Sequence, residues 1–420
     1  MEHSRLYKKS ILAVALALAS QHAMAAGFQL NAQSATGLGR AFAGDAVIAD
    51  NASVMSKNPA AMALFKSSQF STGLNVINTS IDIKDVQHTN AINQTSSVED
   101  AHNGEGTLVP NIYYVHRLND TWAFGAGVYS NFGTKNDFPE NWGGQAAVSP
   151  TAKQFGGITE IQSIDYALTA SYRLNEHLSF GAGLDVIHGQ GKLYRGTGSD
   201  ADANGVNINA NGTGFGWNTG VVYEVDKNTR FGLDYHYSPE IKAKGMVEYN
   251  GSSYDNVKLP LPSFAEFSGY HRFEDSKFAL HYSIQWIDWS VFKSLDIENY
   301  AGSTTPLKEY QWKDGWHYSI GGTYYLNKAW TLRAGYMYDT AAQDQLTSIS
   351  VPDSDRQWFT TGLSYHFSKH HTIDFGIAYI MGKDTNVEES NYLGNTRIGT
   401  VTAVTKADAV ETGIQYSYSF

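Results

Sequence analysis

The sequence predicts an all-β fold, a transmembrane antiparallel β-barrel of about 14 strands with an N-terminal plug inside its lumen. Three observations predict this fold. Apolar and polar residues alternate with a period of two through most of the chain, short polar turns alternate with long loops, and one stretch near the N-terminus lacks the alternation. A period of two places successive side chains on opposite faces of a strand, so each segment has one apolar face.

The first 25 residues are expected to be a signal peptide. Arg5, Lys8 and Lys9 precede the apolar run "ILAVALALA", and "AMA" at 23–25 is a small-residue cleavage site. The mature protein is then expected to begin at Ala26. A transmembrane anchor is the alternative, but the run is about half as long as the roughly 20 apolar residues that a spanning helix needs.

Composition favours a barrel over other exported folds. The chain has 26 Tyr, 20 Phe, 9 Trp and 40 Gly, yet it is polar on average. A barrel reconciles these values because each lipid-facing residue alternates with a lumen residue. The absence of cysteine excludes disulfides, thiol catalysis and thiolate metal sites. A net charge of -11 argues against nucleic-acid partners and fits acidic outer loops.

The barrel is expected to span residues 68–420. Tight polar turns are predicted at 117–120, 173–176, 225–228, 273–276, 326–329 and 368–371. Longer loops rich in Gly, Asn, Ser and Asp are predicted near 84–104, 131–159, 196–213, 248–260, 291–308, 340–355 and 382–403. Short turns at one end and long loops at the other are typical of outer-membrane barrels, and the segments between them number about 14.

The last segment, "VETGIQYSYSF" at 410–420, shows the alternation clearly. We expect this strand to pair with the first one near Phe70, with its aromatic residues in the periplasmic aromatic girdle. A soluble two-sheet protein is the alternative. It is disfavoured because the face opposite the apolar one repeatedly carries glycine and charged residues, which suits a lumen.

Residues 26–67 do not alternate. They are rich in Ala, Gly, Ser and Asn and cannot supply the lipid-facing side of a strand. A disordered exported arm is one interpretation. The other is a compact plug inside the lumen, where the backbone polar groups find partners and scattered apolar residues act as anchors: Phe28, Leu38, Phe42, Ile48, Met62 and Phe65.

Several stretches carry a family resemblance. They are "AGFQLN" at 26–31, "SATGLGRAFAGDAVIADNAS" at 34–53, "NPA" at 58–60, "SNFG" at 130–133, "GFGWNTGVVYEVDKN" at 214–228, "SISVPDSDR" at 348–356 and the terminal aromatic strand. On these stretches the chain resembles the long-chain fatty-acid transporters of the Gram-negative outer membrane, whose relatives import aromatic hydrocarbons. The N-terminal block is the most specific part of the resemblance.

The resemblance implies a fourteen-stranded barrel with an N-terminal hatch, here residues 26–67, which include the motif Asn58, Pro59 and Ala60. It also implies passive uptake: a hydrophobic ligand is caught outside, binds in the lumen and leaves sideways at an inward kink of the third strand. That strand is expected from Thr121 to Phe132, so the kink positions are Ser130, Asn131, Phe132 and Gly133. Glycine and broken alternation suit a bend. A strand that simply ends in a loop fits the same residues.

Four ligand-binding residues follow from the resemblance. Phe28 would touch the acyl chain from the hatch, and Arg195 and Lys308 would meet the carboxylate. Asp339 would tune or hold these cations or contact the hatch backbone. A fatty carboxylate that leaves water needs charge-assisted donors, which Arg and Lys supply. The alternative is a lumen network of charged residues that only braces the barrel.

The outer capture site is less defined. Some family members have a long apolar loop after the fifth strand, whereas 196–213 here is predicted to be a short polar loop. Either capture is weaker, or another loop serves; 131–144, with Phe132, Phe138 and Trp142, is a candidate.

Other function classes find little support. The chain has no G-x-S-x-G motif, its 14 histidines are dispersed, and neither a catalytic residue nor a metal or cofactor is expected. A general porin and an importer of neutral or aromatic hydrocarbons remain alternatives to fatty-acid uptake. The expected partners are a long-chain fatty acid or another hydrophobic small molecule, with outer-membrane lipid and lipopolysaccharide around a monomer.

Overall fold

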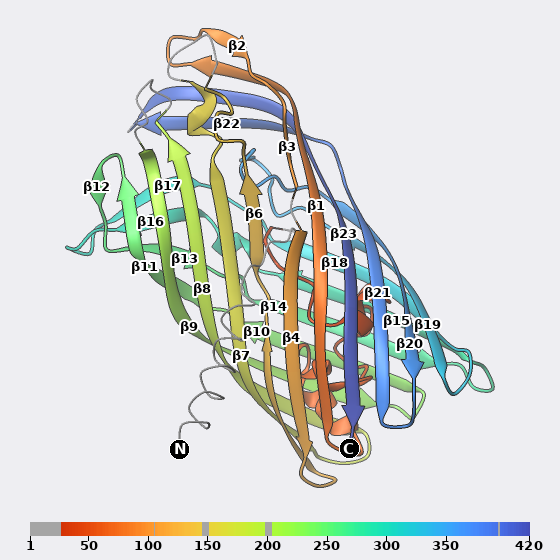
Figure 1. The fold of residues 1–420 in the computed structure, drawn as a ribbon. Coiled ribbons are helices and arrows are strands. Elements are labelled where there is room, and N and C mark those ends of the chain that lie inside the picture. Colours follow the sequence, from red (N-terminus) through yellow and green to blue (C-terminus); the bar gives the residue numbers. More distant parts are fainter. Residues whose placement is uncertain (1–26, 105, 145–150, 198–203, 394) are drawn as a thin grey trace, which may run out of the picture.

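One closed antiparallel barrel forms the molecule, with tilted strands of unequal length (Figure 1). The structure is a computed structural model, which describes residues 27–104, 106–144, 151–197, 204–393 and 395–420. The predicted signal peptide and its cleavage site lie outside these residues. β1 (Gln69–Asn90) pairs with β23 (Thr396–Ser419), and Phe70 faces Tyr418 in this closing seam, as predicted.

The other strands are β2 (Thr95–Ser97), β3 (Ala101–Asn103), β4 (Gly106–Arg117), β5 (Trp122–Tyr129), β6 (Gly133–Asp137), β7 (Ile158–Arg173), β8 (Leu178–Gly196), β9 (Asn204–Glu224), β10 (Thr229–Tyr237), β11 (Glu240–Tyr249), β12 (Ser252–Ser253), β13 (Asn256–Pro260), β14 (Phe264–Arg272), β15 (Phe278–Ile287), β16 (Ser294–Glu298), β17 (Thr304–Glu309), β18 (Gly315–Tyr325), β19 (Trp330–Asp339), β20 (Arg356–His366), β21 (His371–Gly382) and β22 (Thr385–Leu393). Several of these are halves of one wall strand that is interrupted. Counted that way, the barrel has 14 strands, which confirms the predicted fold class.

The predicted period-two alternation and the tight turns are confirmed. β4 ends at Arg117 and β5 begins at Trp122, and the other five predicted tight turns likewise join neighbouring strands. Large apolar side chains point outward from the wall: Leu168, Leu184 and Phe215 are 68%, 71% and 74% exposed. The residues between them point into the lumen, so the outward face is the surface that lipid would cover.

The outer half of the barrel differs from the prediction. Predicted loops such as 84–104, 196–213, 248–260 and 382–403 contain strand residues, and only parts of them are turns. Ile208 and Ala210, for example, lie in β9 and are buried against Val247 of β11. The Gly- and Asn-rich composition of these stretches indicated loops. Their backbone nevertheless pairs as strands, in agreement with a weak alternation of apolar and polar residues. The interpretation of 196–213 as a short polar loop is therefore wrong for 204–213, which lie in β9, while 198–203 lie outside the described residues.

The wall strands are interrupted on one side of the barrel. The breaks lie between β10 and β11, between β13 and β14, between β15 and β16, and between β17 and β18. Above the breaks, β11, β13, β16 and β17 pair with one another, and β11 also pairs with β9 of the wall. The short 3-10 helix η4 (Trp289–Val291) occupies one of the breaks. Residues at the breaks are released from strand alternation and can point inward.

Residues 27–65, here called the lumen segment, fill the inside of the barrel (Figure 1). The segment contains α2 (Ala35–Leu38), η1 (Ala52–Ser56) and η2 (Pro59–Leu64), which are capped by the side chains of Ser34, Asn51 and Asn58. Nearly all of its residues are buried, so it does not form an exposed arm. No helix among the described residues is long and apolar enough to cross a membrane.

The lumen segment contacts both strands of the closing seam. The hydroxyl of Ser34 and the N–H of Ala35 donate to Oε1 of Gln415 in β23, each over 3.0 Å. The N–H of Ala52 donates to Oγ of Ser71 in β1 over 3.1 Å. The segment therefore bridges the first and last strands from the inside.

Glycines on the lumen face make room for this segment. A Cβ added to Gly181 would lie 2.2 Å from the amide nitrogen of Ala60, and one added to Gly232 would lie 2.4 Å from the carbonyl oxygen of Ala46. Both distances are well below van der Waals contact. The glycines seen opposite the apolar residues in the sequence are thus positions where backbone packs directly on backbone.

We expect Gly181→Val to displace η2 from the wall, because the new side chain would occupy the place of the Ala60 backbone. Single-channel conductance in planar bilayers should rise as the lumen becomes accessible to ions. Gly191→Val in the same strand is the matched control, since its Cβ would meet only the Glu160 carbonyl oxygen at 3.8 Å. Equal conductance of the two variants would contradict this account of the packing.

Candidate ligand-binding site in the lumen

Phe28 lies at the centre of a buried aromatic cluster, here called the Phe28 pocket. Its ring centroid is 4.5 Å from that of Trp289, 5.4 Å from that of Phe292 and 5.8 Å from that of Trp312. Phe132 completes the cluster at 6.3 Å. All five side chains are at most 4% exposed. The lumen segment thus places its own aromatic ring among aromatic rings of the wall.

Interruptions of the wall create this pocket. Trp289 and Phe292 lie in the break between β15 and β16, and Trp312 lies in the break between β17 and β18. Neither tryptophan was singled out from the sequence. The signal available there was the loss of alternation in "IDWSVF" and "YQWKDG", which can equally mark an ordinary loop.

The third wall strand also breaks. It was expected to run from Thr121 to Phe132, but β5 ends at Tyr129 and the chain resumes as β6 at Gly133. By the alternation of β5, Phe132 would face lipid, yet it is fully buried and contacts Phe28. The strand therefore continues beyond Ser130–Phe132 after turning inward, so it does not simply end in a loop.

The inward turn leaves a gap in strand pairing. Pairing between β4 and β5 ends at Ile112 and Val128 among the described residues. β4 nevertheless continues to Gly106 along β1, whereas the strand pairing of β6 is with β7. We call this interruption between the upper half of β4 and β6 the lateral gap. A cleft of about 400 Å³ lies near its upper end, lined by residues that include Ile81, His102, Lys135 and Phe138.

Arg195 is buried at the outer end of β8. Its Nη1 donates to the carbonyl oxygens of Ile158 and Tyr194, both over 2.7 Å, and its Nη2 donates to Oγ1 of Thr159. No acidic side chain among the described residues forms an ion pair with it. The guanidinium is thus held by neutral oxygens and keeps its positive charge available to a nearby anion.

Lys308 lies on β17 above the aromatic residues. Its Nζ forms an ion pair with Glu389 and donates to Oγ of Ser348 over 2.8 Å. The same Nζ is 5.2 Å from the ring centroid of Tyr310, which packs on Phe292 at 4.9 Å. Tyr310 therefore connects the cationic group to the Phe28 pocket.

Asp339 is fully buried at the end of β19. Its Oδ1 lies 3.2 Å from Nε2 of His317, and Nδ1 of His317 is within 3.4 Å of Nδ2 of Asn31. Asp339 thus faces the lumen segment through a histidine, whereas Arg195 and Lys308 bond to the outer hairpins.

Arg356 and Asp353 were missed as separate candidates, although both lie in the "SISVPDSDR" stretch. Arg356 is paired across the sheet with Asp339, and its Nη2 contacts Oδ1 of Asp353 at 2.9 Å. The same Oδ1 accepts from the N–H of Gly27. Burial raises the pKa of Asp353, and the charge of Arg356 opposes this shift. Nε and Nη1 of the buried Arg356 donate to no described residue. Through Asp353, which also bonds to Gly27, Arg356 is a third cation close to Phe28.

The motif Asn58, Pro59 and Ala60 fixes the far end of the lumen segment. Oδ1 of Asn58 caps η2 by accepting from the N–H of Ala60, and its Nδ2 donates to the carbonyl oxygens of Ala46 and Val221. Pro59 occupies the first position of η2, where its missing N–H costs nothing. The motif therefore joins two parts of the segment to β9.

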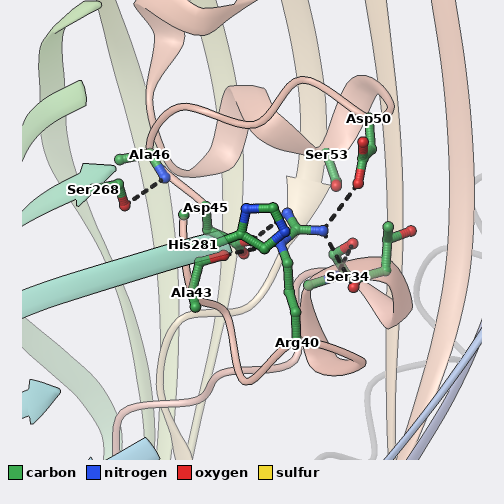
Figure 2. A network of polar contacts seen from close by, with 12 residues as sticks. Ser34, Arg40, Ala43, Asp45, Ala46, Asp50, Ser53, Ser268 and His281 are labelled. Carbon is green, nitrogen blue, oxygen red and sulfur yellow. Dashed lines mark hydrogen bonds and ion pairs between the residues drawn. The ribbon is translucent and has the colours of Figure 1, made fainter. Parts of the chain in front are cut away.

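A network of charges, buried except for the 30% exposed side chain of Asp50, holds the middle of the segment (Figure 2). Nη2 of Arg40 contacts Oδ1 of Asp45 at 2.6 Å, and its Nη1 contacts Oδ2 of Asp50 at 3.0 Å. Asp50 also pairs with Arg333 of β19 at 3.3 Å. The cavity beside Arg40 measures about 10 Å³, which is room for one water at most. This part of the lumen is therefore a tightly packed anchor and leaves no space for a lipid.

Phe138 and Trp142, two of the candidate outer capture residues, are not exposed to solvent. Phe138 and Trp142 are at most 4% exposed and pack with residues of β1, β3 and β23. Nε1 of Trp142 donates to the carbonyl oxygen of Glu99 over 2.8 Å. Phe138 and Trp142 therefore belong to the outer core.

Comparison with known proteins gives consistent matches. The family model for outer membrane transport proteins (OMPP1/FadL/TodX) matches residues 16–420. The chain is 34% identical to outer membrane protein P1 of Haemophilus influenzae, over 99% of both chains. It is 34% identical to a long-chain fatty acid transport protein of Escherichia coli, over 93% of this chain and 94% of that one. In structure it is similar to a Pseudomonas aeruginosa FadL homologue, with a TM-score of 0.81, 21% identity, and coverage of 94% and 100%. The Pseudomonas putida toluene transporter TodX gives a TM-score of 0.67 at 19% identity, with coverage of 94% and 100%.

We expect Arg40→Met to destabilise the protein by about 3–5 kcal/mol, because it leaves the buried carboxylate of Asp45 without its closest cation. Lys84→Met removes an ion pair with Asp82 that is largely exposed and should cost only about 0–1 kcal/mol. Urea unfolding of the purified proteins in detergent, followed by tryptophan fluorescence, measures both. Similar losses for the two variants would show that the charge network does not anchor the segment.

Proposed function

Because the chain belongs to the OMPP1/FadL/TodX family of outer membrane transport proteins, we propose that it takes up long-chain fatty acids passively. The family transports hydrophobic compounds across the outer membrane of Gram-negative bacteria and consists of transporters, so the open questions are the ligand and its path. The observation that carries the proposal is the Phe28 pocket, a buried aromatic cluster beside buried cations.

The pocket suits an amphipathic ligand. An acyl chain gains about 0.8 kcal/mol for each methylene that leaves water, and aromatic side chains supply such a surface. A carboxylate that leaves water needs charged donors. Arg195 and Lys308 supply them above the cluster, and Arg356 supplies donors beside Gly27. In this proposal Asp339 holds the lumen segment in register through His317 and does not touch the ligand.

We further propose that the lumen segment acts as a hatch. The ring of Phe28 occupies the space that an acyl chain would take, so ligand binding would shift the first residues of the segment. Those residues also pair with the kink at Ser130–Gly133, since Gln29 bridges to Phe132. A bound ligand would then leave through the lateral gap into the lipid. Lipid and lipopolysaccharide would surround the barrel as a monomer.

Import of neutral or aromatic hydrocarbons is the second candidate, because the fold is also that of toluene transporters. Such ligands have no charge for Arg195 or Lys308 to meet, so the buried Arg195 and the partly buried Lys308 favour the acid. A general porin is less compatible, because the lumen segment and its charge network fill the cross-section that ions would use.

Equilibrium binding to the purified protein in detergent separates these functions. We expect a labelled long-chain fatty acid to bind more tightly than a neutral hydrocarbon of similar size. Arg195→Ala should weaken acid binding by roughly 10- to 100-fold, the effect of losing one charge-assisted hydrogen bond, and should leave hydrocarbon binding nearly unchanged.

Arg272→Ala is the control for this measurement, because it removes the same charge at an exposed site next to a tight turn. Only variants that keep the heat-modifiable gel mobility of a folded barrel are compared. If the hydrocarbon binds as well as the acid and Arg195→Ala changes neither, the proposed substrate class is wrong.

A further inference from the structure

At the kink in the third wall strand, the lumen segment supplies the backbone hydrogen bonds that a neighbouring strand would otherwise make. The carbonyl oxygen of Asn131 accepts from the N–H of Leu30 over 2.7 Å, and the N–H of Gly133 donates to the carbonyl oxygen of Phe28 over 2.8 Å. The carbonyl oxygen of Ser130 accepts from Nε2 of Gln33 over 3.0 Å. On this side the lumen segment therefore takes the place of a neighbouring strand.

Two polar side chains of β7 satisfy the kink from the other side. The N–H of Phe132 donates to Oγ of Ser163 over 3.1 Å, and the N–H of Asn131 donates to Oδ2 of Asp165 over 3.3 Å. Oδ1 of Asp165 also accepts from Nδ2 of Asn131. Asp165 is 1% exposed and stands opposite Tyr129, the last residue of β5. The carboxyl group of Asp165 therefore lies at the point where the regular pairing between β5 and β7 ends.

The edge of β4 across the lateral gap carries a proline. The N–H of Arg117 donates to Oγ of Ser68, which precedes β1, whereas the N–H of Leu118 donates to Trp122 of β5. Backbone groups alternate in direction along a strand, so even-numbered residues of β4 direct theirs toward β5. Pro110 therefore faces the gap at a position where it offers no N–H.

A straight third strand would meet this edge. Continuing the register in which Ile112 faces Val128 would set Pro110 opposite Ser130. It would also set Gly106 opposite Thr134, and it would turn Phe132 out of the Phe28 pocket toward lipid. The closed arrangement thus continues the register of β5, whereas β6 is shifted by one residue on β7, with Gly133 opposite Gln162 in place of Ile161. Contacts at the kink must hold the chain in this shifted position.

We propose that Asp165 and Pro110 are positioning residues that keep the lateral gap open. Asp165 holds the backbone of Asn131 inward, and Pro110 removes a donor that the straight strand would use. The inference deepens the proposed function, because it rests on the lateral gap being the exit.

Disulfide formation tests the inference in a chain that has no cysteine of its own. The pair Gly106→Cys and Thr134→Cys would face each other only in the straight arrangement, with both side chains toward lipid. In otherwise unchanged protein we expect slow cross-linking by a mild oxidant. Adding Asp165→Ala should raise the cross-linking rate roughly tenfold, as expected when the buried N–H of Asn131 loses its acceptor.

Two further variants make the test specific. Asp165→Asn keeps an oxygen that can accept from the Asn131 N–H and should cross-link close to the parental rate. Pro110→Thr restores an N–H at the gap and should raise the rate in the Asp165→Ala background. Glu411→Ala is the matched control, because it removes another buried lumen carboxylate, one that bonds to Asn75. All rates are measured on barrels with folded gel mobility.

Fatty-acid uptake by cells that carry the Asp165 variants without the cysteine pair is measured in parallel. Faster cross-linking in Asp165→Ala but not in Asp165→Asn or Glu411→Ala supports the positioning role. An unchanged rate in both Asp165→Ala and its combination with Pro110→Thr overturns it, whatever the uptake. Faster cross-linking with normal uptake would support the positioning role but remove the lateral gap from the proposed transport path.

Discussion

The need to satisfy every backbone polar group without water governs this structure. Inside a hydrocarbon layer an unpaired N–H or carbonyl costs several kcal/mol, so a wall strand cannot leave its neighbour unless other partners are ready. β1 and β23 meet this need by closing the barrel. At the third strand, Leu30, Gln33, Ser163 and Asp165 provide the partners instead. The gap in the wall therefore depends on the segment in the lumen, which supplies hydrogen-bond partners for the backbone at the kink.

The lumen segment depends on the wall in turn. With only a few short helical turns, it has too little internal hydrogen bonding and too small a core to be stable alone. Glycines such as Gly181 and Gly232 let its backbone approach the strands, and Arg333 of the wall shares the charge of Asp50 with Arg40. The interior is therefore rigid around this network, whereas the Phe28 end is held mainly by ring packing and a few hydrogen bonds.

The sequence was most informative in the lipid-facing strands, where apolar and polar residues must alternate with a period of two. Alternation and turn chemistry predicted the barrel, its strand number and the Phe70 seam, because a lipid-facing wall requires a period of two. Loops such as 196–213 were mispredicted because polar strands above the membrane keep only a faint alternation. The positions of Trp289 and Trp312 could not be predicted, since a broken alternation does not tell where a side chain points. The resemblance drew attention to Phe28 and Arg195, but their surroundings arise from contacts between distant strands.

Ser34 and Ala35 bond to β23, and Ala52 bonds to β1. These bonds have a consequence for the assembly of the barrel. The full set of these bonds exists only when β1 and β23 lie side by side with the segment in the lumen. Placing the segment therefore stabilises the closed seam, and closing the seam stabilises the segment in its place. The residues that fill the lumen thus also help to hold the wall closed.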